Sequence, residues 1–244
     1  PVLPSLTRSR SPVIVTVTGD IRAGWSDRSH GDHRWQPGAA DPLDRFVAQV
    51  SGSRPFPPRL HRLRQVHGAT IRIVTDDDPA GGPPEGDGLV SASPSVGLVV
   101  LTADCAAIAL GSDEGVFAAV HAGWRGLRGG VVEAAARAMR GLGATAVHGA
   151  VGPLIHAECY PFSDVDLDSV ASRYGDGVRS VSATGQPALD LPATVTAAFD
   201  AAGVRPVPGV EACTSCDDRY FSHRGRAEVE RQAMVVWSTA GHHR

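Results

Sequence analysis

The chain has 244 residues, of which 42% are hydrophobic and 20% are charged, and its formal net charge is −3. The hydrophobic content is ample for a packed core at this length, and the slightly acidic balance argues against a general nucleic-acid binder. All 23 basic residues are arginine, so a phosphate site has to be built from guanidinium groups or backbone amides.

The first residues and the cysteines bear on the cellular compartment. Residues 1–10 are polar and no long apolar segment follows them, so no signal peptide is predicted. No run approaches the roughly 20 apolar residues that a membrane span requires. The four cysteines are too few and too scattered for a disulfide framework. We expect a soluble cytoplasmic protein with reduced thiols and no membrane partner.

The first half of the chain is predicted to be rich in buried strands. A strand at 13–18 and a turn-rich segment at 19–38 precede a helix that begins at Pro42 and ends at Gly52. A strand near 70–74 comes next. The nearly continuous apolar runs at 96–101, 106–110 and 116–120 are typical of strands that are buried on both faces.

Helices and strands alternate through the second half of the chain. The predicted elements are a helix at 126–143, a strand at 147–151, helices at 164–174 and 192–202, and a strand at 233–237. No composition break separates the two halves. We therefore predict one α/β domain over residues 1–244, in which helices flank mixed β-sheets.

Two histidines and a cysteine stand close to predicted strand ends. His67 precedes a strand, Cys105 lies within or at the end of another, and His121 ends a third. Side chains at strand ends converge on one edge of a sheet, and these three would give a zinc ion three protein ligands with one position open, as in catalytic sites. The spacing alone leaves open that they are unrelated: a loop histidine, a buried cysteine and a hydrogen-bonded histidine.

The segment His121-Ala122-Gly123-Trp124-Arg125-Gly126 joins a predicted strand to a predicted helix. Unpaired backbone N–H groups at a helix N-terminus favour an anion, and Arg125 can add a bidentate contact to phosphate. The alternative is a turn that needs glycine for its backbone angles, with Arg125 solvated.

Several motifs occur in the order found in one protein family. The main ones are Gln65-Val66-His67-Gly68, Asp87-Gly88-Leu89-Val90, Thr102-Ala103-Asp104-Cys105 and the His121–Gly126 segment. Further matches are Gly152-Pro153-x-Ile155, Cys159-Tyr160, Leu189-Asp190-Leu191, Cys213-Thr214-x-Cys216, Phe221-Ser222-His223-Arg224 and Arg231-Gln232. From about Trp25 to Trp237 the chain resembles the YfiH/YlmD family, also called the laccase-domain, polyphenol oxidase, peptidoglycan-editing factor or FAMIN-like family.

The resemblance implies a single-domain α/β sandwich that holds zinc through His67, Cys105 and His121, which are also the expected catalytic residues. It implies a purine nucleoside phosphorylase, a transferase that acts on inosine, adenosine, guanosine and methylthioadenosine with phosphate, and also adenosine deaminase activity, a hydrolase reaction. We expect substrate and phosphate contacts from seven further residues: Arg28, Arg45, Asp87, Asp104, Trp124, Arg125 and Arg224. For deamination, Asp104 or Glu158 would carry protons while zinc activates water. No oligomeric state is predicted.

The chain departs from the family pattern at several positions. Ser29-His30-Gly31-Asp32 replaces a glycine pair, and Asp44-Arg45 stands where Asn-Arg is usual. In Cys159-Tyr160-Pro161-Phe162 the usual glutamate is lost, although Glu158 comes just before. Substrate preference is therefore less well determined by the sequence than the metal ligands.

Two other activities would use the same three ligands. A copper-binding, laccase-like polyphenol oxidase is one, because copper outcompetes zinc in intrinsic affinity. However, a trinuclear copper cluster typically uses His-x-His pairs, and none of the 10 histidines forms such a pair. The other is a cysteine hydrolase with Cys105 as nucleophile and His121 or His67 as base, acting on an amide or a peptidoglycan precursor.

Cys213-Thr214-Ser215-Cys216 forms a C-x-x-C motif. A structural zinc needs a second ligand pair, and in the sequence only Cys159 remains for it. We predict a structural role for the motif, in which it holds the loop that delivers Ser222 and Arg224.

Overall fold

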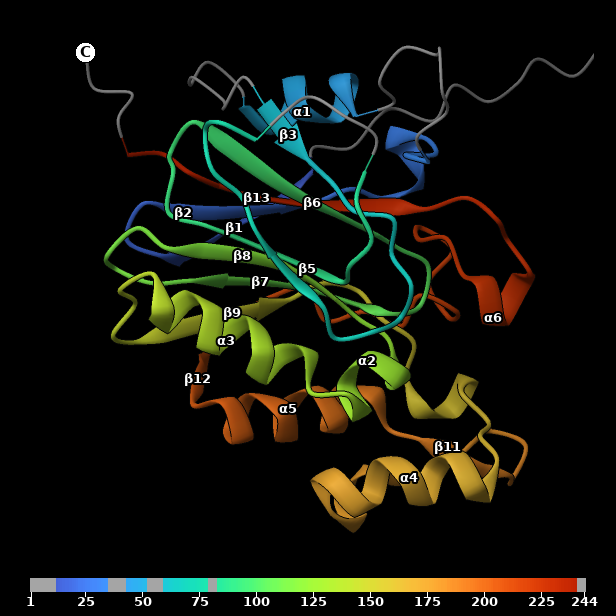
Figure 1. Cartoon of the computed structure of the whole chain (residues 1–244). Helices are drawn as coiled ribbons and strands as arrows, with labels where there is room; N and C mark the ends of the chain where they lie inside the picture. Colours follow the sequence, from blue (N-terminus) through green and yellow to red (C-terminus); the bar gives the residue numbers. More distant parts are fainter. Residues whose placement is uncertain (1–11, 35–42, 52–58, 79–82, 241–244) are drawn as a thin grey trace, which may run out of the picture.

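Two β-sheets pack face to face and are covered by helices on both outer faces (Figure 1). The computed structural model describes residues 12–34, 43–51, 59–78 and 83–240. The five-stranded sheet has the order β1 (Val13–Thr18), β2 (Ile21–Trp25), β13 (Gln232–Ser238), β6 (Val96–Thr102) and β3 (Arg59–His61). The six-stranded sheet has the order β12 (Val204–Pro206), β9 (Val147–Val151), β7 (Ala106–Gly111), β8 (Phe117–Ala122), β5 (Gly88–Ser91) and β4 (Ile71–Ile73). A separate hairpin joins β10 (Arg179–Val181) and β11 (Pro187–Leu189).

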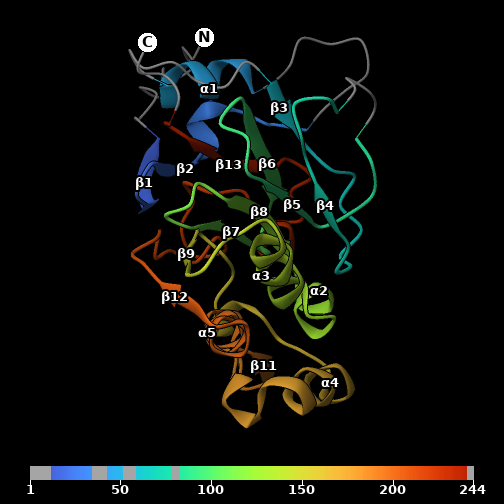
Figure 2. The ribbon, with the colours of Figure 1, turned by 60° about the vertical axis from the view of Figure 1, so that its left-hand side comes forward.

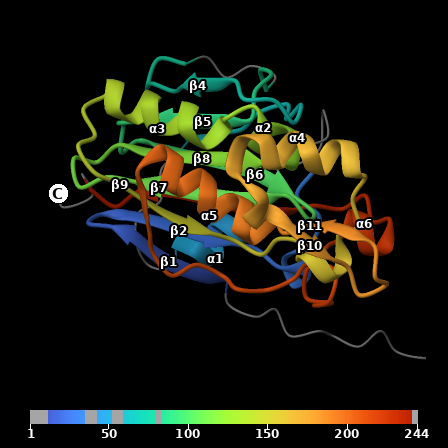
Figure 3. The same cartoon turned by 90° about the horizontal axis from the view of Figure 1, so that it is seen from below.

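The helices lie on opposite sides of this sandwich (Figures 2 and 3). One helix, α1 (Asp44–Ser51), covers the five-stranded sheet. The others lie beyond the six-stranded sheet or at the end of the sandwich: α2 (Trp124–Arg128), α3 (Val131–Gly141), α4 (Asp164–Tyr174), α5 (Leu191–Ala202) and α6 (His223–Arg226). Three short 3-10 helices complete the described elements: η1 (Arg28–His30), η2 (Ala157–Cys159) and η3 (Asp176–Val178).

Three apolar layers hold these elements together, because strands that are buried on both faces carry apolar residues at successive positions. Between the sheets, Leu98 and Val100 of β6 meet Ala107 and Ala109 of β7. On the other face of the six-stranded sheet, alternate residues such as Ile108 pack under α3 and α5. Phe46 and its neighbours on α1 cover the outer face of β6 and β13.

Most predicted elements are confirmed, including the α/β fold class and the strands at 13–18, 70–74, 96–101, 106–110, 116–120, 147–151 and 233–237. The helices at 164–174 and 192–202 are also confirmed within one residue. The helix after Pro42 is confirmed as α1, although Pro42 and Gly52 themselves lie outside the described residues.

Two predictions are corrected. The single helix at 126–143 is two helices, because Gly130 takes a left-handed conformation with φ of 79° and ends the first of them. The segment 19–38, predicted as turn-rich, contains β2 and η1. Among the described helices, none is both long and apolar enough to cross a membrane.

Candidate metal centre and its pocket

One end of the six-stranded sheet gathers four polar residues from four adjacent strands. Cys105 immediately precedes β7, His121 lies near the end of β8, Asp87 immediately precedes β5, and His67 lies in the loop before β4. Because β8 runs antiparallel to both β7 and β5, and β4 runs parallel to β5, all four residues lie at the same edge. The candidate ligand atoms of His67, Cys105 and His121 lie within 4.8 Å of one another. The predicted three-ligand cluster is therefore brought together by the fold.

The buried side chain of Asp87 holds the two histidines in position through hydrogen bonds. Its buried carboxylate accepts hydrogen bonds from the backbone N–H groups of His67 (2.8 Å) and Gly68 (2.6 Å) and contacts Nδ1 of His121 at 2.9 Å. Burial opposes ionisation, but His121 and these amides outweigh it and lower the pKa of Asp87. The contact occupies Nδ1 of His121, so Nε2 is the nitrogen available to a metal. Such carboxylate–histidine pairs orient ligands at metal sites.

Two backbone features allow the close approach of the ligands. His67 takes a left-handed conformation with φ of 60°, which is uncommon for a residue with a side chain. A Cβ at Gly123 would lie 2.9 Å from Cδ2 of His67 and 3.0 Å from Sγ of Cys105. The glycine in the His121–Gly126 motif therefore leaves the space that the ligands occupy.

Cys105 and His121 form an electrostatic pair. Burial opposes the charged form of each group, but the two neighbours favour each other's charge. The pKa of the Cys105 thiol is lowered to about 6, chiefly by His121 and then by His67. The pKa of His121 is raised to about 9 by Cys105 and Asp87. In the metal-free chain the favoured state is thus a thiolate beside an imidazolium, and the thiolate is the form that binds metals.

The donor set fits a zinc ion. Zinc takes imidazole nitrogen at about 2.0–2.1 Å and thiolate at about 2.3 Å in a tetrahedron, which places its ligand atoms about 3.3–3.8 Å apart. The observed cluster, within 4.8 Å, approaches this geometry. Three protein ligands leave the fourth position open to solute. Copper also accepts imidazole and thiolate, so the donors alone do not select the metal.

A pocket of about 500 Å³ opens over the cluster. Its lining includes His67, Cys105 and His121, together with four arginines: Arg34, Arg125, Arg224 and Arg231. Asp104 is the single carboxylate among the lining residues in the described part of the chain, so the pocket carries an excess of positive charge. The aromatic rings of Trp124 and Tyr160 also line it. The arrangement suits a ligand that has both a negative group and a flat apolar ring.

Asp104 is held by a loop from a distant part of the chain. Its Oδ1 accepts hydrogen bonds from the hydroxyls of Thr214 (2.6 Å) and Ser222 (2.7 Å), and its Oδ2 accepts one from the backbone N–H of Arg224 (2.6 Å). Asp104 has φ of 94° and directly precedes Cys105. These contacts anchor the loop beside the candidate metal ligands, and they leave the carboxylate little capacity to contact a substrate.

The structure places the other predicted contact residues in different surroundings. Arg125 and Arg224 lie at the pocket, where their guanidinium groups stack 4.5 Å from the ring of Trp124 and 4.8 Å from the ring of Tyr160. The side chain of Arg45 lies outside the described residues. The anion site predicted at the start of the helix after His121 stays a prediction, and the dipole contributes little to it because α2 has only 5 residues.

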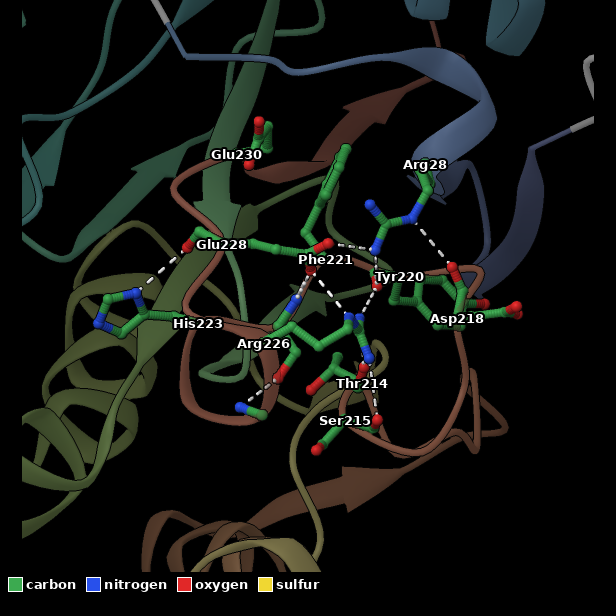
Figure 4. Close-up of polar contacts among 12 residues, drawn as sticks. Arg28, Thr214, Ser215, Asp218, Tyr220, Phe221, His223, Arg226, Glu228 and Glu230 are labelled. Carbon is green, nitrogen blue, oxygen red and sulfur yellow. Dashed lines mark hydrogen bonds and ion pairs between the residues drawn. The ribbon is translucent and has the colours of Figure 1, made fainter. Parts of the chain in front are cut away.

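Arg28 lies in a network beside the pocket rather than in its lining (Figure 4). Its guanidinium donates to the carbonyls of Asp218 (2.9 Å) and Tyr220 (3.0 Å) and pairs with Glu228 at 2.7 Å. Arg226 contacts the same Tyr220 carbonyl and pairs with Glu228 at 3.1 Å. The two arginines therefore hold the 214–230 loop in place.

Sequence reasoning missed Arg34 as a pocket residue and named Arg231 only as part of a motif. No motif marks Arg34, which reaches the pocket from the segment after η1 and pairs with Asp32 at 2.8 Å. Arg231 directly precedes β13, so its position near a strand end was the available signal.

Comparisons with known proteins identify the family of the chain. A family model described as multi-copper polyphenol oxidoreductase laccase matches residues 44–239. A purine nucleoside phosphorylase of Mycobacterium tuberculosis is 34% identical over 92% of this chain and 90% of its own length. One from Streptomyces coelicolor is 34% identical over 82% of this chain and 83% of its own length. A protein named adenosine deaminase, from an unknown prokaryotic organism, is 32% identical over 65% of this chain and 66% of its own length.

Solved structures share the fold. A Neisseria meningitidis protein superposes with a TM-score of 0.78 and 23% identity, covering 94% of this chain and 99% of its own. YlmD from Geobacillus stearothermophilus superposes with a TM-score of 0.73 and 27% identity, covering 90% of this chain and 92% of its own. The motifs, the fold and the family match together establish that this chain belongs to the laccase-domain family of YfiH and YlmD.

Proposed function

We propose that this protein is a zinc-dependent purine nucleoside phosphorylase. The observation that carries the proposal is the cluster of His67, Cys105 and His121 within an arginine-lined pocket of about 500 Å³. A pocket of this size suits a nucleoside and a phosphate ion. Relatives that are 34% identical over most of the chain are named purine nucleoside phosphorylases, which supports the same substrate class here.

The arginines and the aromatic rings of the pocket would contact different parts of the substrate. Arg125 and Arg224 present guanidinium groups to the pocket, and guanidinium groups bind phosphate oxygens through two parallel hydrogen bonds. Trp124 and Tyr160 also line the pocket, and a purine would pack against the parts of their rings that the guanidinium groups of Arg125 and Arg224 leave uncovered. The pocket therefore offers contacts for phosphate and an aromatic surface for a base next to each other.

In phosphorolysis a phosphate oxygen forms a bond to C1′ while the bond from C1′ to N9 of the purine breaks and its electron pair passes to the purine. The ribose carries positive charge in the transition state, and an anchored phosphate beside it is stabilising. When bound at the three ligands, zinc would supply a Lewis acid that favours the departing base. Asp87 keeps His121 in one orientation through the 2.9 Å contact to Nδ1.

Adenosine deamination is a second candidate, because one relative carries that name. It requires a residue that transfers a proton next to the activated water. Asp104 already accepts three hydrogen bonds, and Glu158 does not line the pocket. Neither of the proton carriers suggested by the sequence is therefore well placed, which favours phosphorolysis as the main reaction.

Two further activities fit the ligands less completely. A multi-copper oxidase needs several copper ions, whereas the pocket gathers one group of three ligands in the described part of the chain. A cysteine hydrolase would use the Cys105–His121 pair, whose charged state suits a nucleophile. A chelator separates the metal-dependent enzyme from the cysteine hydrolase. If activity is lost when the metal is removed, the metal enzyme is supported. If activity survives chelation but is lost when the thiol is alkylated, the cysteine hydrolase is supported.

The central test is the release of base from nucleosides. We expect the zinc-loaded protein to release hypoxanthine from inosine and to form ribose 1-phosphate only when phosphate is present. Parallel reactions with adenosine, guanosine and methylthioadenosine, followed by chromatography, would rank the substrates. Equal release of hypoxanthine without phosphate would refute phosphorolysis, and formation of inosine from adenosine would measure deamination.

Removal of one pocket charge should weaken phosphate binding. We expect Arg125→Gln to raise KM for phosphate by about tenfold, the usual effect of losing one charge-assisted hydrogen bond, with a smaller change in KM for inosine. The matched control is Arg137→Gln, because Arg137 is exposed on α3 and does not line the pocket. An equal rise in both KM values would contradict the assignment of Arg125 to phosphate.

A further inference from the structure

A second group of metal-binding side chains lies outside the pocket. It consists of Cys159, Cys213, Cys216 and Glu158, whose candidate ligand atoms all lie within 4.8 Å of one another. Glu158 and Cys159 belong to η2, whereas Cys213 and Cys216 belong to the loop that follows the bridge between Leu154 and Cys213. None of the four lines the pocket.

The side chains of this group lie as close to one another as the four ligands of a single metal ion would. Sγ of Cys216 lies 3.2 Å from Sγ of Cys159 and 3.6 Å from a carboxylate oxygen of Glu158. The backbone N–H of His156 donates to Sγ of Cys213 at 3.4 Å. A donated N–H stabilises a thiolate, and the ligand furthest from solvent, Cys213, is the one that receives it.

We propose that Cys159, Cys213, Cys216 and Glu158 hold a structural zinc ion. Four protein ligands complete a tetrahedron, which distinguishes a structural site from a catalytic one. With Zn–S bonds of about 2.3 Å, three thiolates stand about 3.8 Å apart, so the present arrangement needs only small side-chain movements. Soft thiolate ligands select zinc over magnesium or calcium.

The fold supplies the ligand pair that the C-x-x-C motif lacks. The motif residue Cys216 and its partner Cys159 are 57 positions apart in the chain. They meet because residues 154 and 213 form a β-bridge, which aligns the segment that enters η2 with the segment that enters the motif. Glu158, next to Cys159, then becomes the fourth ligand.

Zinc at this place would brace the active-site loop. Thr214, which lies between two of the ligands, donates to Asp104 at 2.6 Å, and Asp104 directly precedes Cys105. The side chain of Arg226 donates to the carbonyls of Thr214 (3.1 Å) and Ser215 (2.9 Å) on the same loop (Figure 4). The second zinc site would therefore act on the pocket by positioning this loop, without touching the substrate.

The test counts zinc in a protein whose pocket site has been removed. The full-length His67→Ala/His121→Ala variant is purified from zinc-containing medium without added chelator, and its zinc is measured by elemental analysis and native mass spectrometry. We expect about one zinc per chain in this variant, about two in the parent, and none when Cys216→Ser is added. Ser215→Ala, in the same loop, is the matched control and should keep the zinc content of its background.

The reactivity of the thiols provides an independent test of the second zinc site. In the His67→Ala/His121→Ala variant, Cys159, Cys213 and Cys216 should react with a thiol reagent only after a chelator is added, and the denatured mass should be that of four reduced cysteines. A mass 2 Da lower would reveal a disulfide, and a peptide digest that maps it to Cys159 and Cys216 would overturn the proposal. Absence of zinc from a folded variant with reduced thiols would also overturn it.

The two metal proposals can fail separately. One zinc in both the parent and the His67→Ala/His121→Ala variant would retain this second site and remove the metal from the pocket. If the Cys216→Ser protein does not fold, Glu158→Gln provides the alternative variant. It should release zinc to a competing chelator at least tenfold faster, and an unchanged release rate would remove Glu158 from the ligand set.

Discussion

Cys105→Ser is expected to empty the pocket site of zinc and to lower kcat/KM for inosine phosphorolysis by at least about a hundredfold. Changes to residues behind a metal ligand typically cost about 10–100-fold, and loss of a ligand itself should cost more. The thiolate is the anionic member of the ligand set, and a serine hydroxyl stays protonated near neutral pH. Metal content and steady-state rates of the purified variant give the measurement.

A histidine at the other end of the sheet provides the control for this experiment. His148 on β9 pairs with Gly111, at the end of β7 opposite to Cys105. His148→Ala should therefore leave both metal content and rate unchanged, whereas His121→Ala should behave like Cys105→Ser. If Cys105→Ser loses activity but retains the pocket zinc, Cys105 acts as a nucleophile and the cysteine hydrolase becomes the better assignment.

Asp87→Asn should destabilise the protein by about 3 kcal/mol, the scale of leaving buried hydrogen-bonding groups unsatisfied at a charged centre. In the described part of the chain, the groups that contact the Asp87 carboxylate can all donate: the backbone N–H groups of Val66, His67 and Gly68, and Nδ1 of His121. An asparagine would turn its own NH₂ group toward at least one of these donors. Urea unfolding of the metal-free proteins, in which metal binding cannot contribute, would measure the difference.

Asp104→Asn is the matched comparison, and it should cost about 1 kcal/mol or less. The hydroxyls of Thr214 and Ser222 can reverse and accept from the new NH₂ group, while the remaining oxygen still accepts from the N–H of Arg224. Asparagine also tolerates the positive φ of this position better than most residues. Equal destabilisation by the two substitutions would show that the donor-only surroundings of Asp87 are not the reason for its cost.

The meeting of His67, Cys105 and His121, the proposed metal ligands, was predictable because short-range strand pairing determines where they lie. The apolar runs at 106–110 and 116–120 form a tight hairpin in which Ala107 faces His121, so Cys105 and His121 must be neighbours. His67 is joined to them through Asp87, whose backbone carbonyl also accepts from the N–H of His121 at 2.8 Å. The motif order named these residues, but the role of Asp87 behind the ligands required the strand order of the sheet.

Most other features depended on contacts that no local pattern encodes. The short strands β3, β10, β11 and β12 have three residues each, too few to display a period. The break between α2 and α3 rests on the left-handed Gly130 inside an otherwise helical pattern. The meeting of Cys159 with the C-x-x-C motif follows from one β-bridge between distant segments. The short strands and the meeting of the cysteines are therefore set by tertiary pairing, whereas the helix break has a local cause in Gly129-Gly130.

The β7–β8 hairpin places the two candidate ligands at one end and its connecting loop at the other. Cys105 and His121 occupy its open end, whereas the connection at 112–116 follows the Gly111–Phe117 pair at the far end of the sheet. Because β7 also pairs with β9, β8 also pairs with β5 and these strands are buried, a longer connection should leave the strand register and the spacing of the two candidate ligands unaltered. An affinity peptide or a fluorescent reporter inserted there would offer a handle for immobilising or tracking the enzyme at a distance from its chemistry.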